Sequence, residues 1–308
     1  MFFLRLYSIC VFFIDLLNFS ISAFFETISF FIHIFIPSRK KSIKNEIILI
    51  VGASRGIGRA LAQLTAKLGA TVVCLDINIK DNKSLVEEIR NFGGIAYEYT
   101  CDVTSQENVS NTIANIKKEL NTNITMMFHC CGIPSIRKYS TQPPPLRSTM
   151  DLSILSHFWL LDEVLPEMKQ NKHGHIIFLT SVAGISGIER QIPLYVAQFA
   201  VKGLFESLLD ELAKEKLNKN VLVTLAHIYP FVVNKKDNHH GFWSNIPNWF
   251  GQIDTEEAAK LVLEDVLKNH IEISIPKYVL WLSHIVKLLP RRIILIFREF
   301  LDTGVDLG

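Results

Sequence analysis

The chain has 308 residues, a length that can bury the core of one large domain with a little left over. Its net charge of +2 is too small to indicate a nucleic-acid partner. The five cysteines include no C-x-x-C pair, which favours free thiols in a reducing compartment and indicates no metal site. Hydrophobic residues make up 49% of the chain and gather at its two ends, so a membrane is expected there.

Residues 1–44 form an apolar segment followed by a basic cluster. Arg5, Asp15 and Glu26 divide residues 1–36 into pieces, none of which reaches the roughly 20 apolar residues of a clean membrane span. The basic residues between 39 and 44 are typical of the cytoplasmic side. The sequence therefore predicts an uncleaved hairpin or interfacial anchor with the folded domain in the cytosol. A tilted single span is the alternative, although a carboxylate at mid-bilayer costs several kcal/mol.

Strands and helices alternate along residues 45–276, the pattern of a single α/β domain with a doubly wound parallel sheet, or Rossmann fold. Apolar runs predict buried parallel strands at Glu46–Val51, Thr71–Leu75, Ile95–Tyr99, Ile124–His129, His175–Leu179, Val221–Ala226 and Ile271–Ile275. The segments between them predict helices at Ile57–Leu68, Lys83–Asn91, Gln106–Leu120, Arg147–Lys169 and Tyr195–Leu217.

A glycine-rich loop joins the first predicted strand to the first predicted helix. Glycines at 52, 56 and 58 would let the backbone approach a pyrophosphate, which would also meet the positive end of the helix. A tight turn that binds nothing is the alternative.

Two aspartates follow the next two predicted strands. Asp76 can bind the adenosine ribose and would repel a 2′-phosphate, so NAD is favoured, while Arg55 in the loop keeps NADP possible. Asp102 is placed for the adenine. The predicted cofactor-binding residues are Gly52, Ser54, Arg55, Gly56, Ile57, Gly58, Asp76, Asp102 and Val103.

Several motifs resemble those of the short-chain dehydrogenase/reductase family over roughly residues 45–276. They are the Gly-x-x-x-Gly-x-Gly loop, Asp102-Val103 and Thr180-Ser181-Val182-Ala183-Gly184. The apolar anchor, Asp76-Ile77-Asn78 and His157-Phe158-Trp159 are similar to the lipid-droplet 17-beta-hydroxysteroid dehydrogenases and epidermal retinol dehydrogenases.

This resemblance implies an NAD(P)-dependent oxidoreductase for a lipophilic alcohol or ketone, such as a steroid or retinoid. It also implies a place on lipid droplets or the endoplasmic reticulum membrane, with the domain facing the cytosol. Members of the family commonly dimerise through helices near Arg147–Lys169 and Tyr195–Leu217, so a homodimer or a heterodimer with a related reductase is expected.

Catalysis in the family needs a Tyr that exchanges a proton, a Lys four residues later that lowers the pKa of the Tyr, a Ser and an Asn. Ser181 matches the Ser, but gapless alignment places Leu194 and Gln198 at the Tyr and Lys positions. Tyr195 is one residue out of register, about 100° around a helix, and Phe199 occupies its own i+4 position.

The resemblance therefore implies a family member with impaired catalysis, whose remaining candidate catalytic residues are Ser181 and Tyr195. Ser153 stands at the Asn position. The alternative is an active dehydrogenase that uses Tyr195 and Ser181 in a shifted helix register, with Lys202 or His129 as a helper. An impaired protein would instead act as a scaffold through partners or lipids.

Residues 277–308 are again apolar and basic. Trp281 and several Lys and Arg side chains accompany an apolar stretch at Tyr278–Phe300, which suits a membrane surface as well as it suits a packed C-terminal helix. Residues 234–252 carry four aromatic side chains, which suggest an apolar lid or ordinary core packing.

Overall fold

A computed structural model describes residues 2–35, 38–132, 146–181, 192–228, 232–233, 253–294 and 296. The chain divides into two compact units, Met1–Lys40 and Lys41–Gly308, which are treated separately below. The loop at 234–252 and the end of the C-terminal segment beyond residue 296 lie outside the described residues.

The first unit consists of one helix, α1 (Phe2–Phe35), of 34 residues. The helix is unbroken, so the hairpin form of the predicted anchor is wrong. Its Tyr7–Phe25 segment is long and apolar enough to cross a membrane, even though it contains Asp15. Length and composition are therefore compatible with either a span or a helix that lies in the interface. Helix α7 (Ile192–Lys214) passes the same test, but 39% of its apolar window is buried in the domain, as in a core helix.

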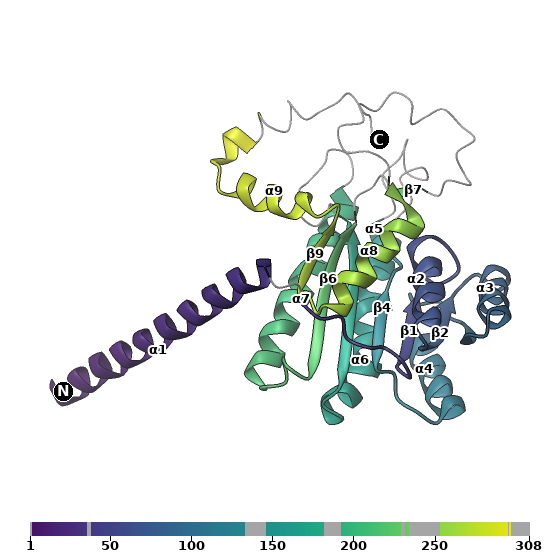
Figure 1. The fold of residues 1–308 in the computed structure, drawn as a ribbon, viewed down its shortest axis with the longest axis horizontal. Helices are drawn as coiled ribbons and strands as arrows, with labels where there is room; N and C mark the ends of the chain where they lie inside the picture. The colour runs from purple at the N-terminus through teal and green to yellow at the C-terminus, as the bar shows by residue number, and fades with distance from the viewer. Residues whose placement is uncertain are drawn as a thin grey trace. The chain divides into compact units, whose positions relative to one another are not determined.

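The second unit is built on a parallel sheet of seven strands in the order β3-β2-β1-β4-β5-β6-β9 (Figure 1). The order reverses direction between β1 and β4, which makes that point the switch point of a doubly wound sheet. The predicted α/β class and the predicted strands are confirmed. The strands are β1 (Ile47–Val51), β2 (Thr71–Asp76), β3 (Ile95–Thr100), β4 (Met126–His129), β5 (Gly174–Ser181), β6 (Val221–Ile228) and β9 (Glu272–Ile275).

Successive residues of each strand point to opposite faces of the sheet, and an apolar core lies on each face. Ile48 and Ile50 of β1 pack with the first set of helices, whereas Leu49 and Val51 pack with the second set. The first set is α2 (Gly56–Lys67), α3 (Ile79–Asn91) and α8 (Thr255–Leu267), and the second set is α4 (Gln106–Leu120), α6 (Ser156–Gln170) and α7. Burial on both faces explains why these strands read as continuous apolar runs in the sequence.

The helix predicted at Arg147–Lys169 is present but is not uniform. It begins as α5 (Leu146–Met150), passes through a π-helical turn, η2 (Asp151–Leu155), and continues as α6. A short two-stranded sheet of β7 (Val232–Val233) and β8 (Ile253–Asp254) lies apart from the main sheet, and α9 (Tyr278–Lys287) follows β9.

A stacked pair of histidines is buried between β4 and α6. The rings of His129 and His157 lie 3.5 Å apart between centroids, at an angle of 17°, and His157 also meets the ring of Phe178. Because Ser156 Oγ donates to Leu152 O, it accepts from His129 Nε2 at 2.9 Å. Within the described part of the chain, neither ring nitrogen of His157 has a hydrogen-bond partner.

Burial lowers the pKa of His129 to about 3 and the pKa of His157 well below its usual value. Both rings are therefore neutral in the folded protein at neutral pH. In the unfolded chain they take up protons below about pH 6.5.

We expect the free energy of unfolding to be insensitive to these groups above about pH 6.5 and to fall below it, by about 1.4 kcal/mol per pH unit for each buried imidazole. His157→Phe should remove one such contribution, so urea unfolding between pH 6.5 and 5 should show a shallower slope. His284→Gln, which removes an exposed imidazole, is the control and should leave the slope unchanged. An equal slope in wild type and His157→Phe would contradict the assignment.

Candidate functional site

The glycine loop lies at the carboxyl end of β1 and opens α2. The N–H of Gly52 donates to Leu75 O at 2.8 Å, which ties the loop to β2. Gly52 and Gly56 have φ values of +82° and +60°, a backbone region that favours glycine. A Cβ on Gly58 would lie 2.1 Å from Gly52 O, so only glycine allows the loop and the helix to approach so closely. The three glycines thus hold a turn that other residues would strain or block.

The open side of this turn is at Gly56. A Cβ built there meets no atom within 4 Å, in contrast to the crowded positions at Gly52 and Gly58. The residue before α2, Arg55, is exposed and makes no side-chain capping bond to the helix. The first N–H groups of the helix therefore face a space that suits an anion, with the exposed Arg55 directly before them in the chain.

Asp76, at the end of β2, is bound to the loop. Its Oδ2 accepts from the N–H of Ser54 at 2.9 Å, and its Oδ1 accepts from the N–H of Asn78 at 2.9 Å. Each carboxylate oxygen keeps a further lone pair for a ligand. The sequence placed Asp76 near a ribose, but it did not reveal that the same carboxylate positions the loop.

Asp102 and Val103 follow β3, next to β2 in the sheet. Asp102 Oδ1 accepts from both the N–H and the hydroxyl of Thr104, at 3.0 and 2.7 Å, while Val103 is buried. The N–H of Cys101 donates to Asp76 O, which holds the ends of the two strands together. The predicted cofactor residues therefore share one edge of the sheet.

Arg59 is a contributor that the sequence reasoning missed. Its guanidinium donates to Ser54 O at 3.2 Å and forms an ion pair with Glu88 of α3 at 2.7 Å. It thus braces the loop against the neighbouring helix. An Arg one turn into a helix gives no signal of this role, because its partners are set by tertiary packing.

Cys130 and Cys131, which follow β4, pack against the glycine loop. A Cβ on Gly52 would meet the backbone N of Cys131 at 3.0 Å, and a Cβ on Gly58 would meet Cys130 Cβ at 3.3 Å. Burial, together with the nearby Asp76 carboxylate, raises the pKa of Cys131 to about 12, which keeps its thiol protonated. Among the described residues, no group of three His, Cys, Asp or Glu side chains is arranged to hold a metal ion.

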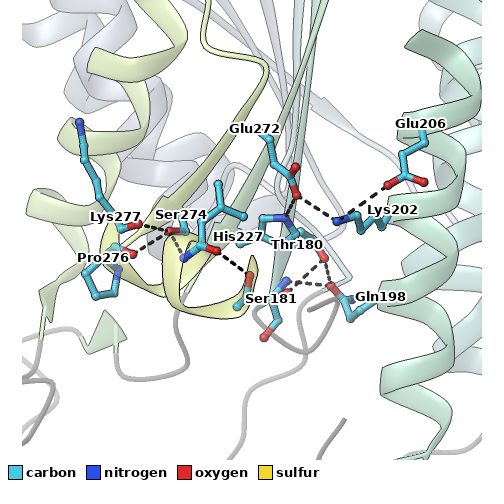
Figure 2. A network of polar contacts seen from close by, with 12 residues as sticks. Thr180, Ser181, Gln198, Lys202, Glu206, His227, Glu272, Ser274, Pro276 and Lys277 are labelled. Carbon is cyan, nitrogen blue, oxygen red and sulfur yellow. Dashed lines mark hydrogen bonds and ion pairs between the residues drawn. The ribbon is translucent and has the colours of Figure 1, made fainter. Parts of the chain in front are cut away.

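A second polar cluster lies at the ends of β4 and β5, around Gln198 of α7 (Figure 2). Gln198 is 2% exposed. Its Oε1 accepts from the hydroxyl of Thr180 at 2.5 Å and from the N–H of Ser181 at 2.9 Å. Its Nε2 donates to Gly132 O at 3.3 Å. A neutral amide thus joins the two strand ends, at the position that the sequence analysis aligned with the family Lys.

Ser153, which the sequence analysis aligned with the family Asn, contributes to the same cluster. It lies in the π-helical turn η2, and its hydroxyl donates to Gly132 O at 2.7 Å. Gly132 O therefore accepts from both Ser153 and Gln198. The structure brings Ser181, Gln198 and Ser153 together through these backbone groups.

Tyr195 lies one turn before Gln198 on α7. The helix begins at Ile192 and runs without interruption to Lys214, so the turn that contains Tyr195 is regular. Leu194 and Tyr195 are each 8% exposed, whereas Phe199, four residues beyond Tyr195, is exposed. The structure thus buries the phenol and places no cation at its i+4 position.

Lys202, the possible helper, is bound elsewhere. Its Nζ lies 3.2 Å from Glu272 Oε1 and 3.8 Å from Glu206 Oε1. Dashed lines in Figure 2 mark both pairs. Glu272 also accepts from His227 Nε2 at 2.8 Å, and this bond, with the charge of Lys202, lowers the pKa of Glu272 to about 2. The Lys202 ammonium is therefore paired with carboxylates on the β9 side of α7. The other helper, His129, is buried and bonded to Ser156.

Comparisons with known proteins agree with this architecture. The sequence profile of a family described as short chain dehydrogenase matches residues 46–239. Human 17-beta-hydroxysteroid dehydrogenase 13 is 30% identical over 281 residues, which cover 91% of this chain and 91% of that protein. Human epidermal retinol dehydrogenase 2 is 28% identical over 279 residues, which cover 90% of this chain and 89% of that protein. These relatives confirm the resemblance to that subgroup.

Two solved structures share the fold. One is a metagenomic short-chain oxidoreductase in complex with NADP, with a TM-score of 0.60 and 21% identity over 76% of this chain and 97% of that one. The other is a short chain dehydrogenase/reductase from Burkholderia phymatum in complex with NAD, with a TM-score of 0.63 and 17% identity over 79% of this chain and 93% of that one.

The Gln198 amide should contribute to stability through its three bonds. Gln198→Met keeps the length of the side chain but leaves the Thr180 hydroxyl and the Ser181 N–H without an acceptor, so we expect a loss of about 1–3 kcal/mol in the free energy of unfolding. Val196→Met, at an exposed position of the same helix, is the matched control and should change stability by less than about 0.5 kcal/mol. Equal urea midpoints for the two variants would refute the role of the amide.

Proposed function

The chain belongs to the short chain dehydrogenase family, and on that premise we propose that it binds NAD(H) but carries out little or no turnover. The observation behind this proposal is Gln198, a buried amide with three hydrogen bonds at the proposed position of the catalytic Lys. The proposed role is that of a nucleotide-holding scaffold on a membrane, with a site for a lipophilic alcohol or ketone.

The nucleotide loop supports the binding part of the proposal. The open space at Gly56, the uncapped start of α2 and the Arg55 side chain together suit a pyrophosphate. Asp76 supplies carboxylate lone pairs for ribose hydroxyls and would repel a 2′-phosphate, so NAD is favoured over NADP. Asp102 and Val103 lie on the next strand end, where the adenine would be held. The solved relatives with NADP and NAD support a dinucleotide in this fold.

The proposed loss of turnover follows from proton transfer. A nicotinamide cofactor supplies or accepts the hydride, but the substrate oxygen still needs a group that donates or accepts a proton. A phenol needs a nearby cation, the role of the Lys in this family, to become an effective acid–base group at neutral pH. Tyr195 has Phe199 at its i+4 position, and the nearest candidate cation on its helix, Lys202, is bound to Glu272. Ser181 retains its place at the end of β5.

The substrate class and location come from the relatives and the anchor. The similar proteins are named as 17-beta-hydroxysteroid, estradiol 17-beta and retinol dehydrogenases, so a steroid, a retinoid or a similar lipid is the proposed ligand. Helix α1 is the proposed attachment to the endoplasmic reticulum membrane or a lipid droplet, with the basic residues after it and the domain on the cytosolic side. A homodimer, or a heterodimer with an active relative, is the proposed assembly.

An active dehydrogenase that uses Tyr195 and Ser181 is the second candidate. The observation in its favour is that Tyr195 is buried as deeply as Leu194, so the phenol is not turned to solvent. This reading needs another group to lower the pKa of the phenol.

The test is to measure NADH binding by fluorescence and turnover on steroid, retinoid and fatty alcohols and ketones, with the full-length protein in vesicles. NADH binding with turnover at background, unchanged in Tyr195→Phe, is the expected result. Turnover that disappears in Tyr195→Phe would establish the active alternative. Absence of NADH binding would overturn both readings.

Gly56 allows the loop to be tested separately from the fold. Gly56→Ala and Gly93→Ala both place a Cβ at a positive φ, +60° and +85°, with no atom within 4 Å. Both should therefore bear a similar backbone penalty of about 1–2 kcal/mol in stability. Only Gly56→Ala should weaken NADH binding, by about tenfold or more, which corresponds to 1.4 kcal/mol. Equal NADH dissociation constants for the two variants would place the nucleotide elsewhere.

A further inference from the structure

Helix α9 presents an apolar stripe to solvent. Its large side chains at 278, 281, 282, 285, 288 and 289 follow helical spacing into the turn that ends the helix, and all six are exposed. Trp281 is 63% exposed and Leu288 is 85% exposed. In an ordinary surface helix, this spacing marks the face that packs on the core. Here the stripe faces away from the domain.

The opposite side of α9 already rests on the domain. Val279, Leu280, Ser283 and Val286 are half-buried, and the N–H of Leu280 donates to Ser274 Oγ at 3.0 Å. An ion pair of Lys277 with Asp265, at 2.9 Å, fixes the start of the helix to α8. Helix α9 therefore has two apolar faces. One face is packed on the domain, and this packing fixes the orientation of the exposed stripe.

The ionisable side chains around the apolar stripe of α9 are all basic. His284, Lys287, Arg291 and Arg292 lie within or just after α9, and the sequence has no Asp or Glu between Glu272 and Glu299. An apolar stripe with a Trp and flanking basic residues matches the chemistry of an interfacial helix on anionic lipid.

The stripe is close to the candidate site. Ser181, Ile228 and Ile275 are paired in register across β5, β6 and β9, so the end of β9 lies two strand spacings, or roughly 10 Å, from Ser181. Helix α9 begins three residues after Ile275. Figure 1 shows α9 beside the end of β9. A surface bound by α9 would thus lie next to the edge of the sheet where the candidate site lies.

We propose that α9 lays its outward stripe into an anionic phospholipid surface and so holds the Ser181 edge of the sheet against the lipid. A lipophilic alcohol or ketone could then reach this edge from the bilayer without crossing water. The inference deepens the membrane part of the proposed function and is independent of nucleotide binding and of turnover.

The test places an environment-sensitive thiol label on Leu282→Cys in a Cys10→Ser background, because Cys10 is the exposed cysteine of the described residues. The full-length protein is bound to phosphatidylcholine vesicles that contain phosphatidylserine and a nitroxide-labelled lipid. The matched control carries the label at Lys83→Cys, an exposed position on α3 at the opposite edge of the sheet.

We expect strong nitroxide quenching at residue 282 and little at residue 83. Arg291→Ala with Arg292→Ala should reduce the quenching at 282, with about a fivefold loss of partitioning for each charge removed. Equal quenching at the two sites in vesicle-bound protein would overturn the role of α9 and leave α1 as the anchor. Failure of the protein to bind vesicles at all would instead overturn the membrane part of the proposed function.

A label that is already shielded before lipid is added would also overturn the proposal. Shielding that depends on protein concentration would mean that a second copy of the chain covers the stripe. Shielding that does not depend on concentration would mean that the chain covers its own stripe.

Discussion

The structure depends on a constraint of parallel sheets: all strands point the same way, so their carboxyl ends, with backbone groups that no longer have a strand partner, meet at one edge. Each of those groups must find a bond in a loop or a side chain. Leu75 O is satisfied by Gly52, the loop N–H of Ser54 by Asp76, and the N–H of Ser181 by Gln198. The candidate site is the set of loop backbone groups and side chains that makes these bonds.

The Gln198 cluster keeps two strand ends together at the position where we propose that the family Lys is missing. A Lys at this place would bring a charge into a buried setting, where only a specific ligand and partners would offset the cost of desolvation. A Gln of similar length carries both a donor and an acceptor, so it can donate to Gly132 O on one strand end and accept from the Thr180 hydroxyl and the Ser181 N–H on the next. The proposed loss of proton transfer therefore need not bring a loss of order.

The sequence predicted elements best where the signal is local and repeated. Strands such as β1 are buried on both faces, so their apolar runs were sufficient to find them. The hairpin form of the anchor was wrong because isolated charges do not break a helix: α1 continues for 34 residues through Arg5, Asp15 and Glu26. The π-helical turn at Asp151–Leu155 was missed because a pattern of period 3.6 carries no sign of one added residue.

The site was predicted only in outline, because local sequence patterns reveal positions along the chain but not contacts between distant residues. The glycine spacing and the strand ends placed Gly56, Asp76 and Asp102 on one edge. The partners that decide what the site can do are distant in sequence. Gln198 bonds Gly132, 66 residues away, and Lys202 pairs with Glu272, 70 residues away. Such pairs are set by how α7 packs on the sheet, which no local pattern reveals.

The two bonds that Asp76 accepts from the backbone of Ser54 and Asn78 have a thermodynamic consequence. They fix the loop from within the chain, so a bound dinucleotide would not have to order it first. A protein that holds the nucleotide and does not consume it gains stability with each increase in nucleotide concentration, by about 2.7 kcal/mol at a hundredfold excess over the dissociation constant. For such a chain the dinucleotide acts as a structural ligand, and its cellular abundance would set how much of the folded protein persists.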